Sequence, residues 1–308
     1  MSEPRARTWA VEPPKVHQHI PLVASLLALG SGAVWSFGAI TARLADGADA
    51  FQYLIWRSIA ILLVIEAVAR LRRRPTVTPH AFRSGPLMLL ACGCLLLASI
   101  AFVYAVKNTT PANAAFLASI TPLVAVVLAR FTLGERLTVV TIVAVAVAFV
   151  GLVVTVAGDL GAGDMRGNVA AVMSSVGFAG YAVCVRSDVR RDWSPVMPGY
   201  ALMMIVLCTA ITLAGDRPLV PPVEDIALAT LHGGVFIVVG TTFFNIASRQ
   251  IPAVAMSVFA QTEMLFVPIW ALIVLDEQPS TQSLVGGAII FTAVVGKALI
   301  DARSRAPT

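Results

Sequence analysis

The chain is divided into ten apolar segments, each long enough to cross a lipid bilayer. A bilayer core about 30 Å thick requires roughly 20 apolar residues of helix, and backbone amides cannot stay unpaired in lipid, so each such segment must be helical. The segments are 20–43, 51–71, 86–107, 111–133, 137–157, 167–187, 196–214, 226–249, 253–275 and 281–301. The pattern therefore predicts an all-α membrane protein with ten transmembrane helices.

The composition agrees with this prediction, because 58% of the 308 residues are hydrophobic and only 13% are charged. Soluble domains carry about 25% charged residues, so this chain has too few polar groups to cover a globular surface. All four cysteines lie inside apolar segments, where small buried side chains are expected. The net charge of +5 comes from basic residues scattered over short loops. That distribution indicates contact with a membrane surface and not with nucleic acid.

The ends of the chain and the distribution of basic residues predict its orientation. Residues 1–19 are expected to form a disordered cytoplasmic tail, and 302–308 a second cytoplasmic tail. With the N-terminus in the cytoplasm, most of the 22 Lys and Arg residues fall on the cytoplasmic side, as the positive-inside rule requires. Both termini are then cytoplasmic, and arginine far outnumbers lysine, which favours a bacterial inner membrane as the location.

One stretch of the sequence occurs twice. Residues 102–138 align without gaps on 244–280, and the match includes a polar break, a second apolar run and a terminal glutamate, Glu135 on Glu277. The chain is therefore read as two repeats, 20–157 and 167–301. Five helices per repeat is an odd number, so the second repeat enters the membrane upside down. An inverted 5+5 repeat is typical of transporters that bind substrate between the halves.

The two repeats also match in their first helices. Trp35 aligns with Phe178, Ser31 with Ser174, and Arg43 with Arg186. The matched aromatic positions favour a role for Trp35 and Phe178 in lining a central cavity, although packing between helices is the alternative.

These features resemble the drug/metabolite transporter superfamily, and specifically its EamA-type ten-helix proteins. The resemblance covers about residues 22–300. It rests on Trp35, Arg57, Thr121-Pro122, Leu133-Gly134-Glu135-Arg136-Leu137-Thr138, Glu263 and Asp276-Glu277-Gln278-Pro279-Ser280. The chain departs from the family pattern in the predicted helix 253–275. In the family a proline commonly follows the glutamate of this helix, but here Met264 follows Glu263 and Pro268 comes a turn later. The resemblance implies a protein that exports amino acids and other metabolites.

Glu263 is the strongest candidate for a functional residue. It lies near the middle of a predicted helix, where an ionised carboxylate costs at least roughly 2.5–3.5 kcal/mol. Helical spacing places Phe259, Phe266 and Trp270 on its face, and a carboxylate between aromatic rings suits an amphipathic cation or zwitterion. Substrate contact, proton carriage and a structural hydrogen bond to a neighbouring helix are the open interpretations.

Arg57 is the second ionisable residue inside a predicted membrane helix. It either meets a substrate carboxylate, pairs with an acidic group, or extends toward the membrane surface. Glu66 lies about half a turn away around the same helix. It is expected to be structural, with Arg70 as its partner.

Further candidates are polar or aromatic residues on other helices. The predicted substrate-binding set is Glu263, Trp35, Phe178, Tyr181, Tyr104, Phe259, Asn245, Gln261 and Arg57. Hydrogen bonding between helices is the alternative for the amides. Pro122 and Pro268 lie inside predicted helices and are expected to act as hinges, because a helix-internal proline removes a backbone hydrogen bond.

The sequence lacks the signatures of an enzyme. No HExxH or GxSxG pattern occurs, and His17, His19, His80 and His232 lie in the tail, in loops or at a helix start. No cofactor and no metal are expected, and without a GxxxxGK[ST] motif the energy must come from a gradient.

We therefore expect a secondary active transporter that works by alternating access and exports small amphipathic metabolites. Amino acids, aromatic ones included, and related amines are the expected substrates. The expected partners are this substrate, the bilayer and protons as coupling ion, with the chain a monomer or homodimer. The alternative is a facilitator or importer of another small solute, such as a sugar or nucleotide sugar.

Overall fold

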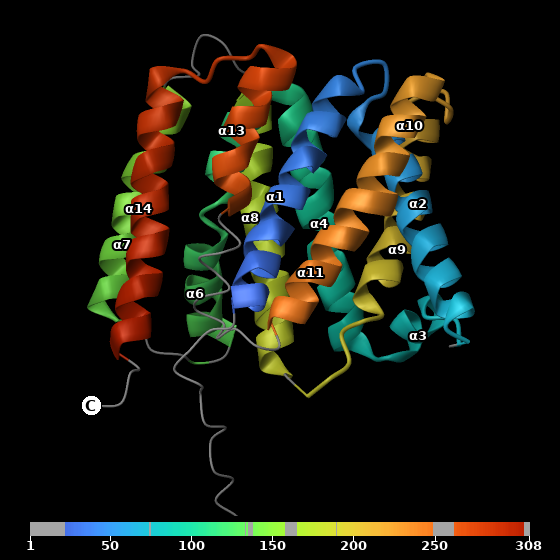
Figure 1. Ribbon diagram of the computed structural model, residues 1–308, viewed down its shortest axis with the longest axis horizontal. Helices are drawn as coiled ribbons and strands as arrows, with labels where there is room; N and C mark the ends of the chain where they lie inside the picture. The colour runs from blue at the N-terminus through green and yellow to red at the C-terminus, as the bar shows by residue number, and fades with distance from the viewer. Residues whose placement is uncertain are drawn as a thin grey trace, which may run out of the picture.

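The computed structural model describes residues 22–73, 75–132, 134, 138–157, 165–188, 190–248 and 262–304, which form helices and loops without any strand (Figure 1). The first half contains α1 (Leu22–Leu44), α2 (Ala50–Leu71), α3 (Thr78–Arg83), α4 (Pro86–Asn108), α5 (Pro111–Ala118), α6 (Thr121–Thr132) and α7 (Val139–Ala157). The second half contains α8 (Met165–Ser187), α9 (Val196–Ala214), α10 (Val223–Leu231), the π-helical η1 (His232–Ile237), α11 (Val238–Ser248), α13 (Thr262–Leu275) and α14 (Thr281–Ser304).

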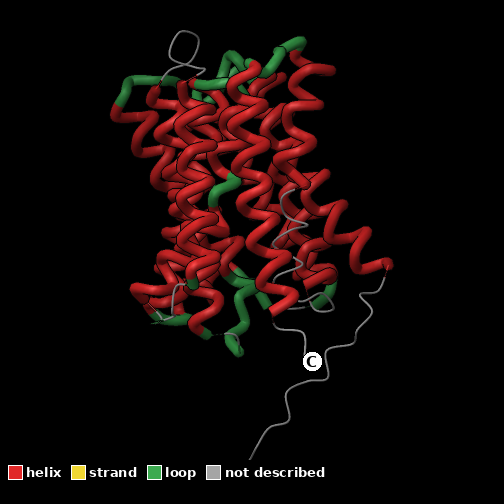
Figure 2. The backbone as a smooth tube through the Cα atoms, turned by 90° about the vertical axis from the view of Figure 1, so that its left-hand side faces the viewer, coloured by secondary structure: helices red, strands yellow, loops and turns green. Residues whose placement is uncertain are grey.

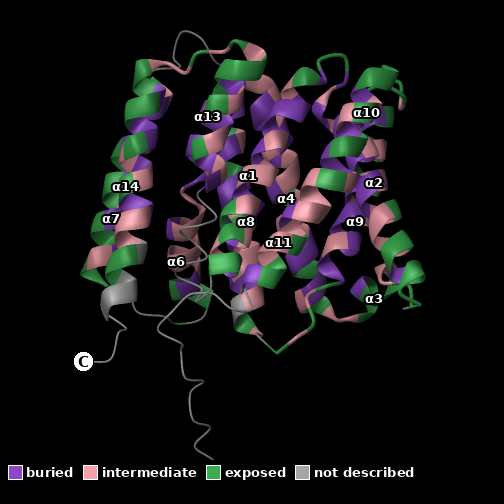
Figure 3. Ribbon diagram, in the orientation of Figure 1, coloured by how far each residue is buried: buried purple, intermediate pink, exposed green. Residues whose placement is uncertain are grey.

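The described helices have the length and apolar character that a bilayer requires. Seven spans qualify on both counts: Leu22–Leu44, Pro86–Asn108, Pro111–Thr132, Val139–Ala157, Met165–Val185, Val196–Ala214 and Val223–Ala247. Thr262–Leu275 and Thr281–Lys297 are shorter apolar helices. The outer faces of α7 and α14 expose large apolar side chains, as a lipid-facing surface would (Figure 3). The chain is a multi-pass, all-α membrane protein.

The long helices stand side by side and form one bundle, in which their axes run roughly parallel (Figures 1 and 2). α1 begins and α14 ends at the same end of the bundle, which we call the terminal end; the other is the opposite end. α8 begins at the opposite end, so the second half runs through the bundle in the reverse direction from the first (Figure 1).

The two halves interlock. The most extensive helix contacts are α4 with α8, α7 with α14, α2 with α9, and α1 with both α11 and α13. Each of these pairs joins a helix of the first half to a helix of the second. The largest buried cluster likewise draws on both halves, with Tyr53, Ile61 and Met88 from the first and Tyr200 and Met204 from the second.

The α4–α8 contact depends on small residues. A Cβ on Gly177 would lie 2.6 Å from the backbone nitrogen of Ala98 and 2.8 Å from the carbonyl oxygen of Cys94. The Ser174 hydroxyl, one turn earlier on α8, donates a 2.9 Å hydrogen bond to the Ala98 carbonyl. Glycine and serine thus allow the two backbones to approach closely, as is common between membrane helices.

We expect Gly177→Leu to destabilise the protein strongly, because overpacking a close contact costs about 1–3 kcal/mol or more. Thermal unfolding of the detergent-purified protein is the measurement. Gly93→Leu on α4 is the matched control, since a Cβ there meets no atom within 4 Å. Equal unfolding temperatures for the two variants would show that this contact adapts freely.

The span 111–132 is interrupted at Ser119 and Ile120, between α5 and α6. Figure 2 shows this interruption as a loop-coloured segment half-way along the bundle. Pro122 cannot donate a backbone hydrogen bond, and the Thr121 hydroxyl bonds the Ala118 carbonyl at 2.7 Å instead. The Ser119 hydroxyl similarly bonds the Phe116 carbonyl at 2.6 Å. The predicted disturbance at Pro122 is therefore a real break, and Pro268 lies inside α13.

Candidate functional site: a charged cavity between the two halves

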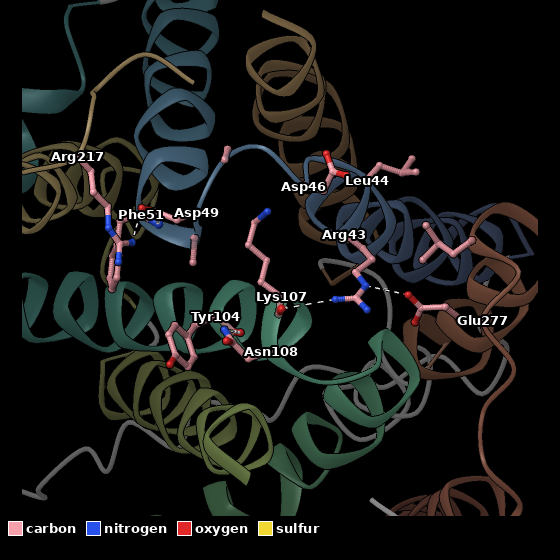
Figure 4. A pocket seen from close by; sticks show the side chains of 13 residues that line it. Arg43, Leu44, Asp46, Asp49, Phe51, Tyr104, Lys107, Asn108, Arg217 and Glu277 are labelled. Carbon is pink, nitrogen blue, oxygen red and sulfur yellow. Dashed lines mark hydrogen bonds and ion pairs between the residues drawn. The ribbon is translucent and has the colours of Figure 1, made fainter. Parts of the chain in front are cut away.

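A cavity of about 700 Å³ opens at the opposite end of the bundle (Figure 4). Its wall is formed by the end of α1, the loop to α2, the end of α4, the α9–α10 loop and the end of α13. The lining residues are Arg43, Leu44, Asp46, Ala48, Asp49, Ala50, Phe51, Tyr104, Lys107, Asn108, Arg217, Leu275 and Glu277. Three cationic and three acidic side chains thus face one space, contributed by both halves of the chain.

An ion pair crosses between the halves at one side of the cavity. Arg43 in the last turn of α1 lies 2.8 Å from Glu277, measured from Nε to Oε1 (Figure 4). A cation suits this position because the carboxyl end of a helix carries partial negative charge. The two side chains are 34% and 28% exposed, so the pair adds little to stability. The other oxygen of Glu277, Oε2, is buried and has no hydrogen-bond partner among the described residues.

A second ion pair crosses between the halves on the other side of the cavity. Arg217, in the α9–α10 loop, lies 2.7 Å from Asp49, which caps α2 (Figure 4). The Asp49 carboxylate also accepts hydrogen bonds from the amides of Phe51 and Gln52, and the Asp49 amide donates one to the side-chain oxygen of Gln52. This capping box fixes the carboxylate. The Arg217 side chain is 57% exposed, so this pair is the weaker of the two.

A polar chain leads from the cavity wall into the bundle. Lys107 donates a hydrogen bond to the Ala45 carbonyl and lies 5.5 Å from the centre of the Tyr53 ring. The Tyr53 hydroxyl lies 3.1 Å from Thr41 Oγ1 and 2.8 Å from His232 Nδ1. Sequence reasoning missed His232 because it was read as a residue at a helix start. The available signal was an ionisable residue inside the apolar segment 226–249, which is a functional candidate by default.

Arg57 lies in the interior of the bundle and does not extend to the surface. Its side chain is only 3% exposed, and Nη2 donates a 2.7 Å hydrogen bond to the Ser99 hydroxyl. Its Nε is buried and has no hydrogen-bond partner among the described residues, and no described carboxylate forms an ion pair with Arg57. A buried cation of this kind is costly, so Arg57 remains a candidate for binding an anionic group.

Glu263 lies away from the cavity. It is half-buried in the first turn of α13, about 21 Å of helix rise from Glu277. Phe259 and Gln261, predicted beside it, fall outside the described residues. Two aromatic residues predicted on its face stack on each other, Phe266 and Trp270, with centroids 5.8 Å apart.

The Trp270 ring connects α13 to α1. It stacks on Phe37 at 4.8 Å, and its indole nitrogen donates a 2.9 Å hydrogen bond to the Ser36 hydroxyl. Phe37 in turn stacks on Phe236 of η1 at 5.4 Å. This row of rings packs helices of the two halves together below the cavity.

The remaining predicted lining residues have separate surroundings. Tyr104 lines the cavity. The Trp35 ring packs against the ring of Phe244 on α11, with the ring centroids 5.5 Å apart. Phe178, in contrast, is 44% exposed and lies edge-on to Tyr181 on its own helix. Asn245 is exposed. The structure therefore does not bring Trp35 and Phe178 together at one cavity.

Glu66 is structural, and hydrogen bonds contribute more to its environment than the predicted charge interaction with Arg70. One oxygen of its carboxylate accepts hydrogen bonds from the amides of Val77 and Thr78 and from the Thr78 hydroxyl, at 3.0, 2.8 and 2.6 Å. It therefore holds the start of α3 against α2.

Among the described residues, no cluster of three or more His, Cys, Asp or Glu side chains has a geometry that suits a metal ion.

Comparison with known proteins agrees with this architecture. No curated protein matches the chain. A solved structure titled "Crystal structure of protein" matches 91% of this chain and 98% of its own, with a TM-score of 0.64 and 21% identity, which shows a shared fold. The EamA-like transporter family matches residues 22–157 and, a second time, residues 165–297. The chain belongs to the EamA-like transporter family.

Proposed function

We propose that the protein is a secondary active transporter that exports small amphipathic metabolites across a bacterial inner membrane. Amino acids, aromatic ones included, and related amines are the proposed substrates. In this proposal the chain forms ten transmembrane helices in two inverted repeats with both termini in the cytoplasm, and the charged cavity then opens on the outer side. Movement of the halves against each other then provides alternating access.

The observation that carries this proposal is the cavity itself. It lies where the two halves meet and presents Arg43, Lys107 and Arg217 beside Asp46, Asp49 and Glu277. A zwitterion needs partners of both signs, and charge-assisted hydrogen bonds to carboxylate and ammonium groups are among the strongest available. A phosphorylated solute is less favoured, because two of the three cations are paired with carboxylates.

The cavity, the ion pairs and the helix breaks together suggest how access alternates. The pairs Arg43–Glu277 and Arg217–Asp49 cross between the two halves at the outer end, where they would break and form again as the halves move. The break before Pro122 and the proline inside α13 supply points at which helices bend. Glu263, further toward the terminal end, is proposed as the substrate or proton contact on the inner half of the path.

Transport in proteoliposomes under a pH gradient tests the proposal. The panel includes aromatic and aliphatic amino acids, amines, and a sugar phosphate as probe of the alternative function. We expect an amino acid or amine to move, and Glu263→Gln to reduce its pH-dependent flux at least tenfold, because the amide cannot ionise. Transport of the sugar phosphate alone would favour the alternative. Equal behaviour of wild type and Glu263→Gln would make Glu263 structural.

A further inference from the structure

His232 is the buried titratable residue that the proposed function leaves unused. It begins the π-helical segment η1 and lies about 14 Å from Val223 along the continuous helix formed by α10, η1 and α11. The residue is 4% exposed. Single π-helical turns occur frequently at functional sites. The side chain lies between α1 and α2, directly below the charged cavity through Tyr53 and Lys107.

The hydrogen bonds define which nitrogen of His232 carries its proton. The Thr41 hydroxyl has one hydrogen, and it donates to the backbone carbonyls of Phe37 and Gly38 at 3.0 and 3.1 Å. Thr41 must therefore accept from Tyr53. Tyr53 has no further hydrogen, so its oxygen accepts from Nδ1–H of His232. Neutral His232 is the Nδ1–H tautomer, and Nε2 presents a lone pair.

The second ring nitrogen lies against the backbone of α1. Nε2 lies against Gly38 of α1, where any Cβ would overlap it. The neutral ring fits here, but a proton on Nε2 would meet no side-chain acceptor from α1.

The charged groups around His232 come from several elements. On α2 they are Tyr53 and Arg57, whose backbone packs against Gly233. Lys107 of α4 lies over the Tyr53 ring, and Asp225, two turns earlier on the same face of the rod, has a buried oxygen without a partner among the described residues. The described part of α1 near the ring offers Gly38 and Thr41, and α11 has no titratable side chain.

We propose that His232 is a proton-binding site of the transporter, reached from the charged cavity. This inference rests on the proposed function, and it adds a proton site on η1 to the contact proposed at Glu263. In the step, the Nε2 lone pair takes one proton from a hydronium ion that enters at the cavity, so an N–H bond forms, one O–H bond breaks and neutral water is left. The ring becomes an imidazolium with both nitrogens as donors, and no other bond forms or breaks.

The geometry couples this proton to opening of the outer end. In the structure, the new Nε2–H would have no side-chain acceptor at Gly38, and an unsatisfied buried donor is costly. The added charge would also face Arg57 and Lys107. Protonated His232 therefore favours separation of η1 from α1, which lets water reach the ring. A proton bound from the outside would thus favour the state in which the outer side is open, from which an exported solute leaves.

Ring-nitrogen NMR of ¹⁵N-histidine-labelled protein in nanodiscs tests the site without any substrate. The chain has four histidines, and His232→Asn assigns the signal. We expect the Nδ1–H tautomer at high pH, its loss in Tyr53→Phe, and conversion to the imidazolium as the pH is lowered. An Nε2–H tautomer that Tyr53→Phe leaves unchanged, or a ring that stays neutral throughout, would overturn the proposal.

Transport of the solute found with the panel supplies the functional arm. An inward proton gradient is expected to stimulate transport at least tenfold less in His232→Asn than in the wild type. His80→Asn, at an exposed position on α3, should keep it. Full stimulation in His232→Asn would overturn the proposal. If wild type moves no solute of the panel, the proposed transport function fails, whereas the NMR result still decides proton binding at His232.

Discussion

Glu277→Arg is expected to abolish transport. The substitution places a second guanidinium where Arg43 now finds a carboxylate 2.8 Å away. The two groups repel each other, so in the proposed cycle the end of the bundle that carries the cavity cannot close. An alternating-access cycle that cannot close one end stops, and we expect the initial rate in proteoliposomes to fall at least tenfold. The double variant Arg43→Glu/Glu277→Arg restores the attraction and should recover most of that rate.

The second ion pair provides a matched control for this experiment. Arg217→Glu also reverses a cation opposite a carboxylate, but Arg217 is 57% exposed, and exposed pairs contribute little. Its effect on the rate should be several times smaller. A Glu277→Arg variant with the wild-type rate, or a charge-swapped double variant that stays inactive, would show that the Arg43–Glu277 pair does not close the outer end.

Arg57→Met is expected to separate transport from stability. Methionine fills a similar volume and removes a buried charge whose only described bond is the one to Ser99. Replacing buried ions with apolar side chains is often neutral or stabilising, so the unfolding temperature should stay equal or rise. If the Arg57 guanidinium binds an anionic group of the solute during transport, the initial rate of transport should nevertheless fall at least tenfold.

Arg70→Met is the control on the same helix, because Arg70 is exposed. It should change neither the rate nor the unfolding temperature. Should Arg57→Met lose stability and transport together, Arg57 would be a structural residue of the α2–α4 contact. A wild-type rate in Arg57→Met would remove it from the transport mechanism.

The helices could be predicted from the sequence because lipid leaves the backbone no alternative. Each of the ten predicted segments contains a described helix, and α1 and α7 begin within two residues of their predicted starts. The break at Pro122 was likewise visible, because proline removes a hydrogen bond wherever it stands. The Asp49 capping box has a local signature as well.

The site could not be predicted in the same way. Arg43 and Glu277 are 234 positions apart, and nothing local to either residue indicates the other. Their meeting depends on how α1 packs against α13. His232 likewise becomes interpretable only when Tyr53 and Thr41 reveal its hydrogen-bond direction. Phe178 shows the opposite error, since its match to Trp35 in the repeat did not bring the two rings to one surface.

The interlocking of the halves has a consequence for biosynthesis. When the chain up to the end of α7 has left the ribosome, α4 and α7 still lack the neighbours that cover them, because those neighbours are α8 and α14. The close-packing surface around Ala98 then faces lipid until Gly177 arrives. Final packing must therefore wait for the last helix, and a nascent chain stalled half-way would present the membrane quality-control machinery with unpaired helix surfaces.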